Sequence, residues 1–174
     1  MKSGSMVIDA QAIEHLELLE VPGRSRLQRE GSFFNFISQG CSTAFGKRLL
    51  KRWVVGPLKD PSKINDRIDA VTDLVNNEVT RDKLQAKLRK VPDLERMLSR
   101  IYTYSQRASV KAIYIDISVI KRLDEFYTLL GVLKKLQDII TEVFDKDVLK
   151  VLRSKRLRAL VQFKKIEKGS SIVA

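Results

Sequence analysis

The chain has few of the residues that carry catalytic chemistry or interrupt helices. Its 174 residues include one cysteine, one histidine, four prolines and eight glycines. The single cysteine, Cys41, has no partner for a disulfide within the chain, which favours a reducing compartment such as cytosol or nucleus. No run approaches the roughly 18 apolar residues that a membrane-spanning helix needs. Scarce glycine and proline beside abundant leucine, lysine and arginine predict an all-α protein.

A chain of this length fits one domain, because about 70% of the unfolded surface can be buried on folding at this size. We expect a helical domain over residues 6–168. The opening MKSGS, residues 1–5, resembles a remnant of an expression tag, and residues 169–174 resemble the start of a linker. The N-terminus shows no basic region followed by an apolar stretch and a cleavage site, so we expect no secretory signal.

The charge balance is strongly basic, with a formal net charge of +12 and a pI near 9.9. Such a charge favours polyanions, chiefly nucleic acid, through phosphate contacts that release counterions. Lysine and arginine also cover helices by laying their stems along apolar surface, so both interpretations stay open. The candidate phosphate contacts are Lys47, Arg48, Lys51, Arg52, Arg153, Lys155 and Arg156.

Helix-start signals divide the chain into successive helices. Serine, threonine and aspartate are preferred N-caps, and proline is tolerated at the first helical position. The expected starts are at Ser32, Thr43, Asp60, Thr80 and Pro92.

The helix after Thr43 carries Phe45, Leu49 and Trp53 at a spacing of four residues, opposite a basic face. Gly56-Pro57 is expected to end it, because proline disfavours helical geometry in the residue before it. If the Trp53 ring is buried, its replacement by alanine would cost about 3 to 5 kcal/mol.

A longer helical pattern runs from Ser109 toward Asp145, with apolar residues every three or four positions. Unbroken, such a helix of ~35 residues would be about 50 Å long. We expect a kink or break at Gly131, since glycine inside a helix costs about 1 kcal/mol relative to alanine. A last helix is predicted from Asp147 to Phe163.

The Gly46-Lys47 pair does not form a phosphate-binding loop. That motif needs four residues between its first glycine and the Gly-Lys pair, then a serine or threonine. Here five residues separate Gly40 from Gly46, and Arg48 stands where the hydroxyl belongs. Gly46 is better explained as a close-packing glycine inside an amphipathic helix.

Other site chemistry is equally sparse. A hydrolase centred on His15 or Cys41 would lack an identifiable base, orienting group and oxyanion hole. No cluster of His, Cys, Asp and Glu has metal-ligand spacing. Asp93 and Glu95 fit the first turn of a helix, where acids stabilise the dipole, better than a catalytic pair.

Four ordered blocks of sequence carry a family resemblance. The first is Met6-Val7-Ile8-Asp9-Ala10, followed by Leu16-Glu17-Leu18. The second combines Thr43, Gly46, Arg48, Leu49, Leu50, Lys51, Trp53, Pro57 and Leu58. The third is Ile64 to Val71, with Arg67 at its centre, and the fourth runs from Pro92 to Ile101. Together they resemble the central core, or lever, domain of the MutS family of DNA mismatch-repair proteins.

Details of the match vary along the chain. Ala112-Ile113 and Leu130-Gly131-Val132-Leu133 look more like the eukaryotic mismatch-binding subunit of MutSα than its partner subunit. His15 stands where many family members carry asparagine. The resemblance implies structural roles for Asp9, Thr43, Gly46, Arg48, Leu49, Leu50, Trp53, Pro57, Arg67, Asp93, Leu94, Glu95 and Arg96.

The resemblance implies a mechanical module. In the family this all-α domain joins the ATPase to a clamp around DNA, and neither the Phe-x-Glu mismatch reader nor the phosphate loop is found here. We therefore expect a non-enzymatic part of a larger nuclear protein, ending near the clamp. That parent would use ATP and magnesium, bind double-stranded DNA and pair with a second MutS-family subunit, without a membrane. A free-standing basic helical nucleic-acid-binding domain is the alternative.

Overall fold

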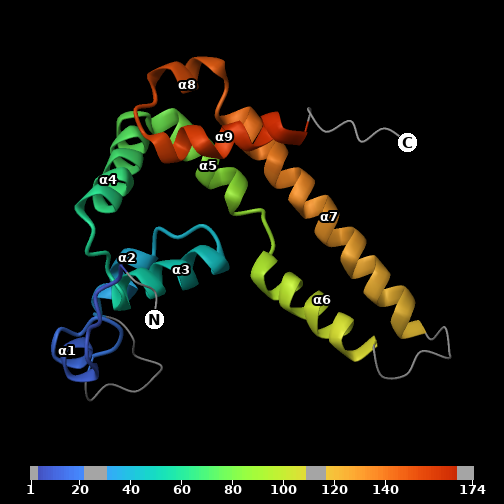
Figure 1. Ribbon diagram of the computed structural model, residues 1–174, viewed down its shortest axis with the longest axis horizontal. Helices are drawn as coiled ribbons and strands as arrows, with labels where there is room; N and C mark the ends of the chain where they lie inside the picture. Colours follow the sequence, from blue (N-terminus) through green and yellow to red (C-terminus); the bar gives the residue numbers. More distant parts are fainter. Residues whose placement is uncertain (1–3, 22–30, 109–116, 168–174) are drawn as a thin grey trace. The chain divides into compact units, whose positions relative to one another are not determined.

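The computed structural model describes residues 4–21, 31–108 and 117–167 (Figure 1). Within these ranges the chain is all-α, as predicted, and the one β-type pairing described is an isolated bridge between Ser5 and Leu58. The helices are α1 (Ala10–His15), α2 (Phe33–Ser38), α3 (Ala44–Val55), α4 (Pro61–Asn76), α5 (Glu78–Leu88), α6 (Leu94–Ala108), α7 (Ile117–Val143), α8 (Lys146–Val151) and α9 (Lys155–Glu167).

The chain divides into two compact units. The first unit comprises Met1–Glu78 with Arg153–Arg156, and the second comprises Val79–Leu152 with Leu157–Ala174. Each unit has its own internal contacts.

Local caps form most of the expected helix starts. Ser32 Oγ accepts from the Asn35 amide at 3.2 Å, and Asp60 Oδ1 accepts from the Ser62 amide at 3.0 Å. These caps satisfy backbone donors that have no partner inside the helix. The start expected at Thr80 is wrong: α5 begins at Glu78, and Thr80 is buried within its first turn.

Backbone pairing joins separate segments of the first unit. The amides of Phe33 and Phe34 donate to the carbonyls of Glu17 and Leu18 at 3.1 and 2.9 Å, and α2 packs on α3. The N-terminal segment pairs with the turn after α3, since Lys59 donates to the Gly4 carbonyl at 3.2 Å. Gly4 and Ser5 thus take part in the fold, and the origin of residues 1–5 stays a prediction.

The apolar face of α3 remains partly exposed, so the condition of a buried Trp53 ring is not met. No residue of α3 is buried, and Leu49 and Trp53 are 40% and 37% exposed. Described residues buried in the first unit are polar instead: Ser32, Ser38, Asp73 and Ser154.

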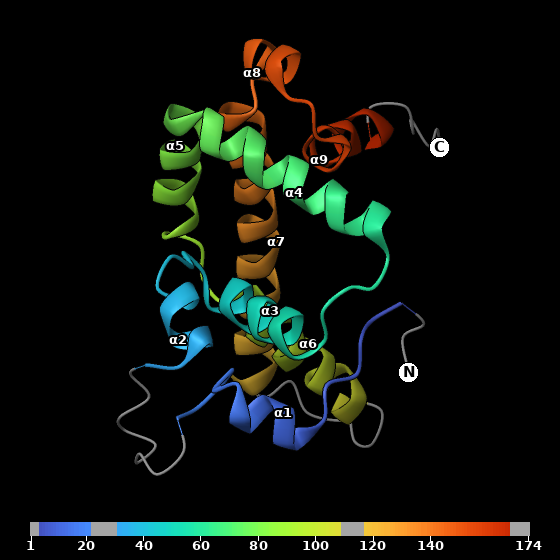
Figure 2. The same cartoon turned by 90° about the vertical axis from the view of Figure 1, so that its left-hand side faces the viewer.

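The second unit contains the apolar core of the described residues. Helix α6 packs along the first half of α7 (Figures 1 and 2). Arg100 Nε lies 3.5 Å from Glu125 Oε2 across this pair, and the Arg122 guanidinium lies 5.2 Å from the centre of the Tyr104 ring. The buried apolar residues are Val91, Met97, Leu129, Ile139, Val143, Phe144, Leu152 and Leu157.

Helix α7 continues through Gly131, so the break expected there is wrong. Gly131 is exposed, and an added Cβ would have no neighbour within 4 Å. Leu129 and Ile139, on either side along the helix, are 3% and 5% exposed. Their packing outweighs the modest helix cost of one glycine. The predicted start at Ser109 and the Ala112-Ile113 motif lie outside the described residues.

The single helix predicted from Asp147 to Phe163 is also wrong. Helix α8 ends at Val151 and α9 begins at Lys155. Leu152 has an extended ψ of 131°, which ends the α8 ladder. Backbone amides in this interval bind a side chain from α4, a contact that no local pattern signals.

Candidate functional site

The most distinctive side-chain contact of the first unit joins α3 to α4. The Arg67 guanidinium lies 3.7 Å from the centre of the Trp53 ring. A planar guanidinium stacks well on an indole face, which makes arginine the better cation for this contact. The sequence blocks marked both residues separately, and the structure brings them together.

The Arg67 site is electropositive. Burial lowers the pKa of the Arg67 guanidinium, and the neighbouring charge of Arg156 lowers it further. Arginine nevertheless stays protonated at neutral pH. The Nε atom of Arg67 is buried without a hydrogen-bond partner among the described residues. The indole face therefore supplies the main contact that the structure describes for this cation.

The candidate phosphate contacts form two groups in the first unit. Lys47, Lys51 and Arg52 have exposed side chains on α3, with Arg48 half-buried among them. Lys47 Nζ also lies 6.0 Å from the centre of the Phe34 ring. Exposure permits phosphate contact without demonstrating it, so their role stays a prediction. The second group, around the start of α9, is Arg153, Lys155 and Arg156.

The Thr-x-x-Gly part of the second sequence block is a capping device. Thr43 Oγ1 accepts from the Gly46 amide at 3.1 Å. A Cβ at position 46 would lie only 2.7 Å from the same hydroxyl oxygen. Only glycine leaves that oxygen undisturbed, which confirms the predicted close-packing role of Gly46. Asp9 works similarly at α1, where its Oδ1 accepts from the Ala12 amide at 2.6 Å.

Other motif residues are also engaged in backbone structure. The Pro57 carbonyl accepts from the Met6 amide at 2.7 Å, which links the first two sequence blocks. Asp93 Oδ1 accepts from the Arg96 amide at 3.3 Å, and this confirms the predicted cap of α6. Leu50, Leu94 and Glu95 are half-buried on their helices.

Sequence reasoning missed Asp73, the most deeply placed carboxylate of the first unit. Its side chain is 8% exposed, and Oδ2 accepts from the amides of Arg153 and Ser154 at 2.8 and 2.7 Å. A buried carboxylate needs such donors to offset its lost hydration. Asp73 lies off the Ile64, Ile68 and Val71 stripe of α4, and its partners are 80 and 81 residues away. No local pattern could have indicated it.

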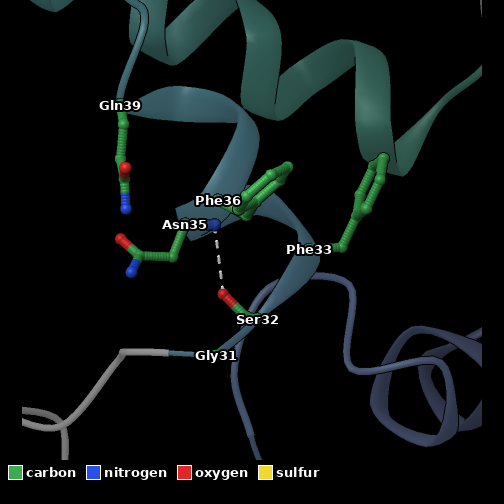
Figure 3. Close-up of a pocket in the computed structure, with 6 residues that line it drawn as sticks. All are labelled: Gly31, Ser32, Phe33, Asn35, Phe36 and Gln39. Carbon is green, nitrogen blue, oxygen red and sulfur yellow. Dashed lines mark hydrogen bonds between the residues drawn. The ribbon is translucent and has the colours of Figure 1, made fainter.

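A hollow beside α2 offers little chemistry (Figure 3). It encloses about 500 Å³, and its lining contains no ionisable side chain. Two of its lining residues, Phe33 and Phe36, are 51% and 76% exposed. The lining residues are Gly31, Ser32, Phe33, Asn35, Phe36 and Gln39.

Neither alternative centre gains support from the structure. His15 is exposed at the end of α1, and Cys41 is half-buried before α3. The described residues hold no group of three or more His, Cys, Asp or Glu suited to a metal ion. None of the described helices has the length and apolar character to cross a membrane.

The comparisons with known proteins all indicate the same family. The family profile described as MutS domain III matches residues 11–171. The DNA mismatch repair protein Msh6 of Gallus gallus is 42% identical over 98 residues, which cover 56% of this chain. Msh6 of Homo sapiens is 42% identical over 100 residues. The DNA mismatch repair protein MutS of Thermotoga maritima is 34% identical over 132 residues, or 75% of this chain.

These relatives are much longer than the region of similarity. The match spans 7% of each Msh6 sequence and 16% of the Thermotoga maritima MutS sequence.

Proposed function

Because the chain belongs to the MutS family of DNA mismatch-repair proteins and carries its domain III, we propose that it transmits conformational change between other parts of a longer protein. Domain III is a non-catalytic part of that family. The observation that carries the proposal is the family match over residues 11–171, on a fold of long helices with almost no site chemistry.

The physical character of the chain supports a transmission role. Coupling over tens of ångströms needs rigid elements with alternative arrangements. Helix α7 has 27 residues and is therefore about 40 Å long. It is anchored by buried Leu129, Ile139 and Val143. Such a helix can move as one body when force is applied at either end.

The activity of the longer protein is part of the proposal. Its ATPase site, with ATP and magnesium, would lie outside this chain, as would its DNA clamp. The protein would bind mismatched double-stranded DNA together with a second MutS-family subunit. The Msh6 likeness favours the nucleus, whereas MutS relatives are bacterial, so localisation of the tagged full-length protein is a direct check.

The first experiment measures whether this chain grips DNA by itself. Fluorescence anisotropy with matched and mismatched duplexes, at about 50 and 200 mM salt, separates phosphate contacts from mismatch recognition. We expect feeble binding with no mismatch preference. Tight, salt-steep binding would instead mark a basic nucleic-acid-binding domain and contradict a purely connecting role.

A chimera tests transmission directly. Residues 11–171 would replace the matching segment of Thermotoga maritima MutS, which is 34% identical to this chain. We expect the chimera to keep ATP hydrolysis that responds to mismatched DNA. If the chimera hydrolyses ATP at the normal basal rate but does not respond to mismatched DNA, the transplanted domain fails to couple to the rest of the Thermotoga maritima protein. A chimera that couples normally even with α7 interrupted by Gly131→Pro would contradict the transmission role.

A further inference from the structure

The region from Asp147 to Phe163 contains neither proline nor glycine, and its pattern predicts one continuous helix. The structure instead interrupts it at Leu152, Arg153 and Ser154, and the chain turns back between α8 and α9 (Figure 1). Local sequence and tertiary structure therefore favour different conformations of the same three residues.

Asp73 occupies the amides that a continuous helix would use. Its Oδ2 accepts from Arg153 and Ser154 at 2.8 and 2.7 Å. In an uninterrupted helix the same amides would donate to the carbonyls of Leu149 and Lys150. Ser154 is fully buried and Asp73 is 8% exposed, so water competes poorly for these bonds.

A second side chain occupies the matching acceptor. Arg158 Nε donates to the Leu152 carbonyl at 2.9 Å, and its Nη2 also donates there. A continuous helix would give that carbonyl the amide of Arg156. Both arrangements therefore satisfy the same backbone groups, the interrupted one through side chains and the continuous one through the helix ladder.

We propose that the α8–α9 junction is a two-state element and that Asp73 is the latch that holds it open. With Asp73 bound to Arg153 and Ser154, α8 and α9 are separate helices. When Asp73 is withdrawn, these amides return to the ladder and the two helices join. Because the Arg153 and Ser154 amides have an acceptor in either state, withdrawing Asp73 removes the contact that holds them outside the helix ladder. This inference goes beyond the proposed function, since it depends only on these hydrogen bonds.

The experiment uses spin labels at exposed positions on α8 and α9. Lys146→Cys and Ala159→Cys, in a Cys41→Ser background, place the labels 13 residues apart. In a joined helix the two backbone positions are about 20 Å apart along the axis. We expect a shorter distance in the labelled parent chain and a shift toward this longer distance with Asp73→Ala. Backbone carbon chemical shifts at residues 152–154 should become helical in the same variant.

Control variants separate joining from simple fraying. Asp69→Ala removes an exposed aspartate one turn earlier on α4 and should leave the short distance unchanged. Asp73→Asn keeps an acceptor oxygen and should shift the distance less than Asp73→Ala. Arg153→Gly, added to Asp73→Ala, weakens a continuous helix at an exposed position and should reduce the long-distance population.

Two results would overturn the proposal. One is a well-folded Asp73→Ala variant whose label distance and chemical shifts match the parent. The other is rapid amide exchange at Arg153 and Ser154 without helical shifts, which would mean that the junction frays and does not join. Should Asp73→Ala fail to fold, Asp73→Leu, which also lacks an acceptor but fills more of the site, decides by the same two measurements, with an unchanged distance and unchanged shifts counting against the latch.

Discussion

The two units differ in the kind of interaction that stabilises each of them internally. All eight buried apolar residues among those described lie in the second unit, from Val91 to Leu157. The first unit buries serines and Asp73 and leaves Trp53 37% exposed. Apolar burial is non-directional and scales with area, whereas a hydrogen bond depends on position and angle. The second unit should therefore tolerate shape-conserving substitutions that the polar anchors of the first unit do not.

Truncating the core of the second unit should have the largest effect. Leu129 is 3% exposed on α7, so Leu129→Ala should cost about 3 kcal/mol through lost burial and a cavity. Urea unfolding followed by far-UV circular dichroism measures this loss. Trp53 is the only tryptophan and lies in the first unit. If Leu129→Ala also shifts the unfolding midpoint measured by Trp53 fluorescence by a large amount, the two units unfold together, which would contradict the comparison.

Removal of the Asp73 anchor should come next. Asp73→Ala takes the acceptor from two amides and should cost about 2 to 3 kcal/mol, reduced by any joining of α8 and α9. The Trp53 fluorescence midpoint reports this change in the first unit. Asp69→Ala is the matched surface control. Equal midpoints for the two variants would show that the buried carboxylate contributes nothing special.

Loss of the Trp53–Arg67 contact should reduce the free energy of unfolding by an intermediate amount. Because the ring is 37% exposed, we expect Trp53→Ala to cost about 2 kcal/mol, below the full burial range. A double-mutant cycle with Arg67→Gln should give a coupling of about 1 kcal/mol, typical of a cation over an aromatic face. Circular dichroism measures all four chains. Strictly additive effects would exclude a specific stacking interaction.

The local cap of α3 should matter less. Thr43→Ala removes the oxygen that accepts from Gly46 and should cost about 1 kcal/mol. Thr43→Ser keeps the hydroxyl and serves as the control in thermal unfolding. If serine and alanine destabilise equally, the lost methyl group and not the cap explains the effect.

Two glycines provide the smallest and most discriminating test. Gly131→Ala meets no neighbour within 4 Å and should stabilise α7 by about 0.5 to 1 kcal/mol. At Gly46 the new Cβ would displace the Thr43 hydroxyl, so the gain in helix propensity should be cancelled by the lost cap. Denaturant midpoints of the two variants measure the difference. Equal stabilisation by both substitutions would contradict the observed geometry at Gly46.

The elements that were predicted correctly depend on neighbours in the chain. Thr43 caps its own helix three residues before its donor, and Asp93 does the same for Arg96. Gly56 ends α3 as the Gly-Pro pair predicts. The four sequence blocks likewise indicated the family without any coordinates. Such features are readable because the interacting groups are separated by a few residues of known geometry.

The errors share the opposite cause. Gly131 was expected to break α7, but packing at Leu129 and Ile139 carries the helix through. The spacing of the apolar stripe on α3 likewise could not show what covers Trp53. Arg67 now covers part of the ring. Which side chain contacts the Trp53 ring depends on the tertiary structure, so residue spacing alone could not predict it.

The sequence by itself determined the all-α class, most helix starts and the membership in the MutS family, because caps, periodicity and motifs are local. Only the tertiary structure decided where the last helix is interrupted. Asp73 reaches its amides across 80 residues of chain, and its carboxylate accepts from two backbone donors that helix propensity alone would have paired locally. The sequence and the structure differ here because the Asp73 carboxylate and the local helix carbonyls compete for the same amides. A distant acceptor can bind them only after the chain has folded.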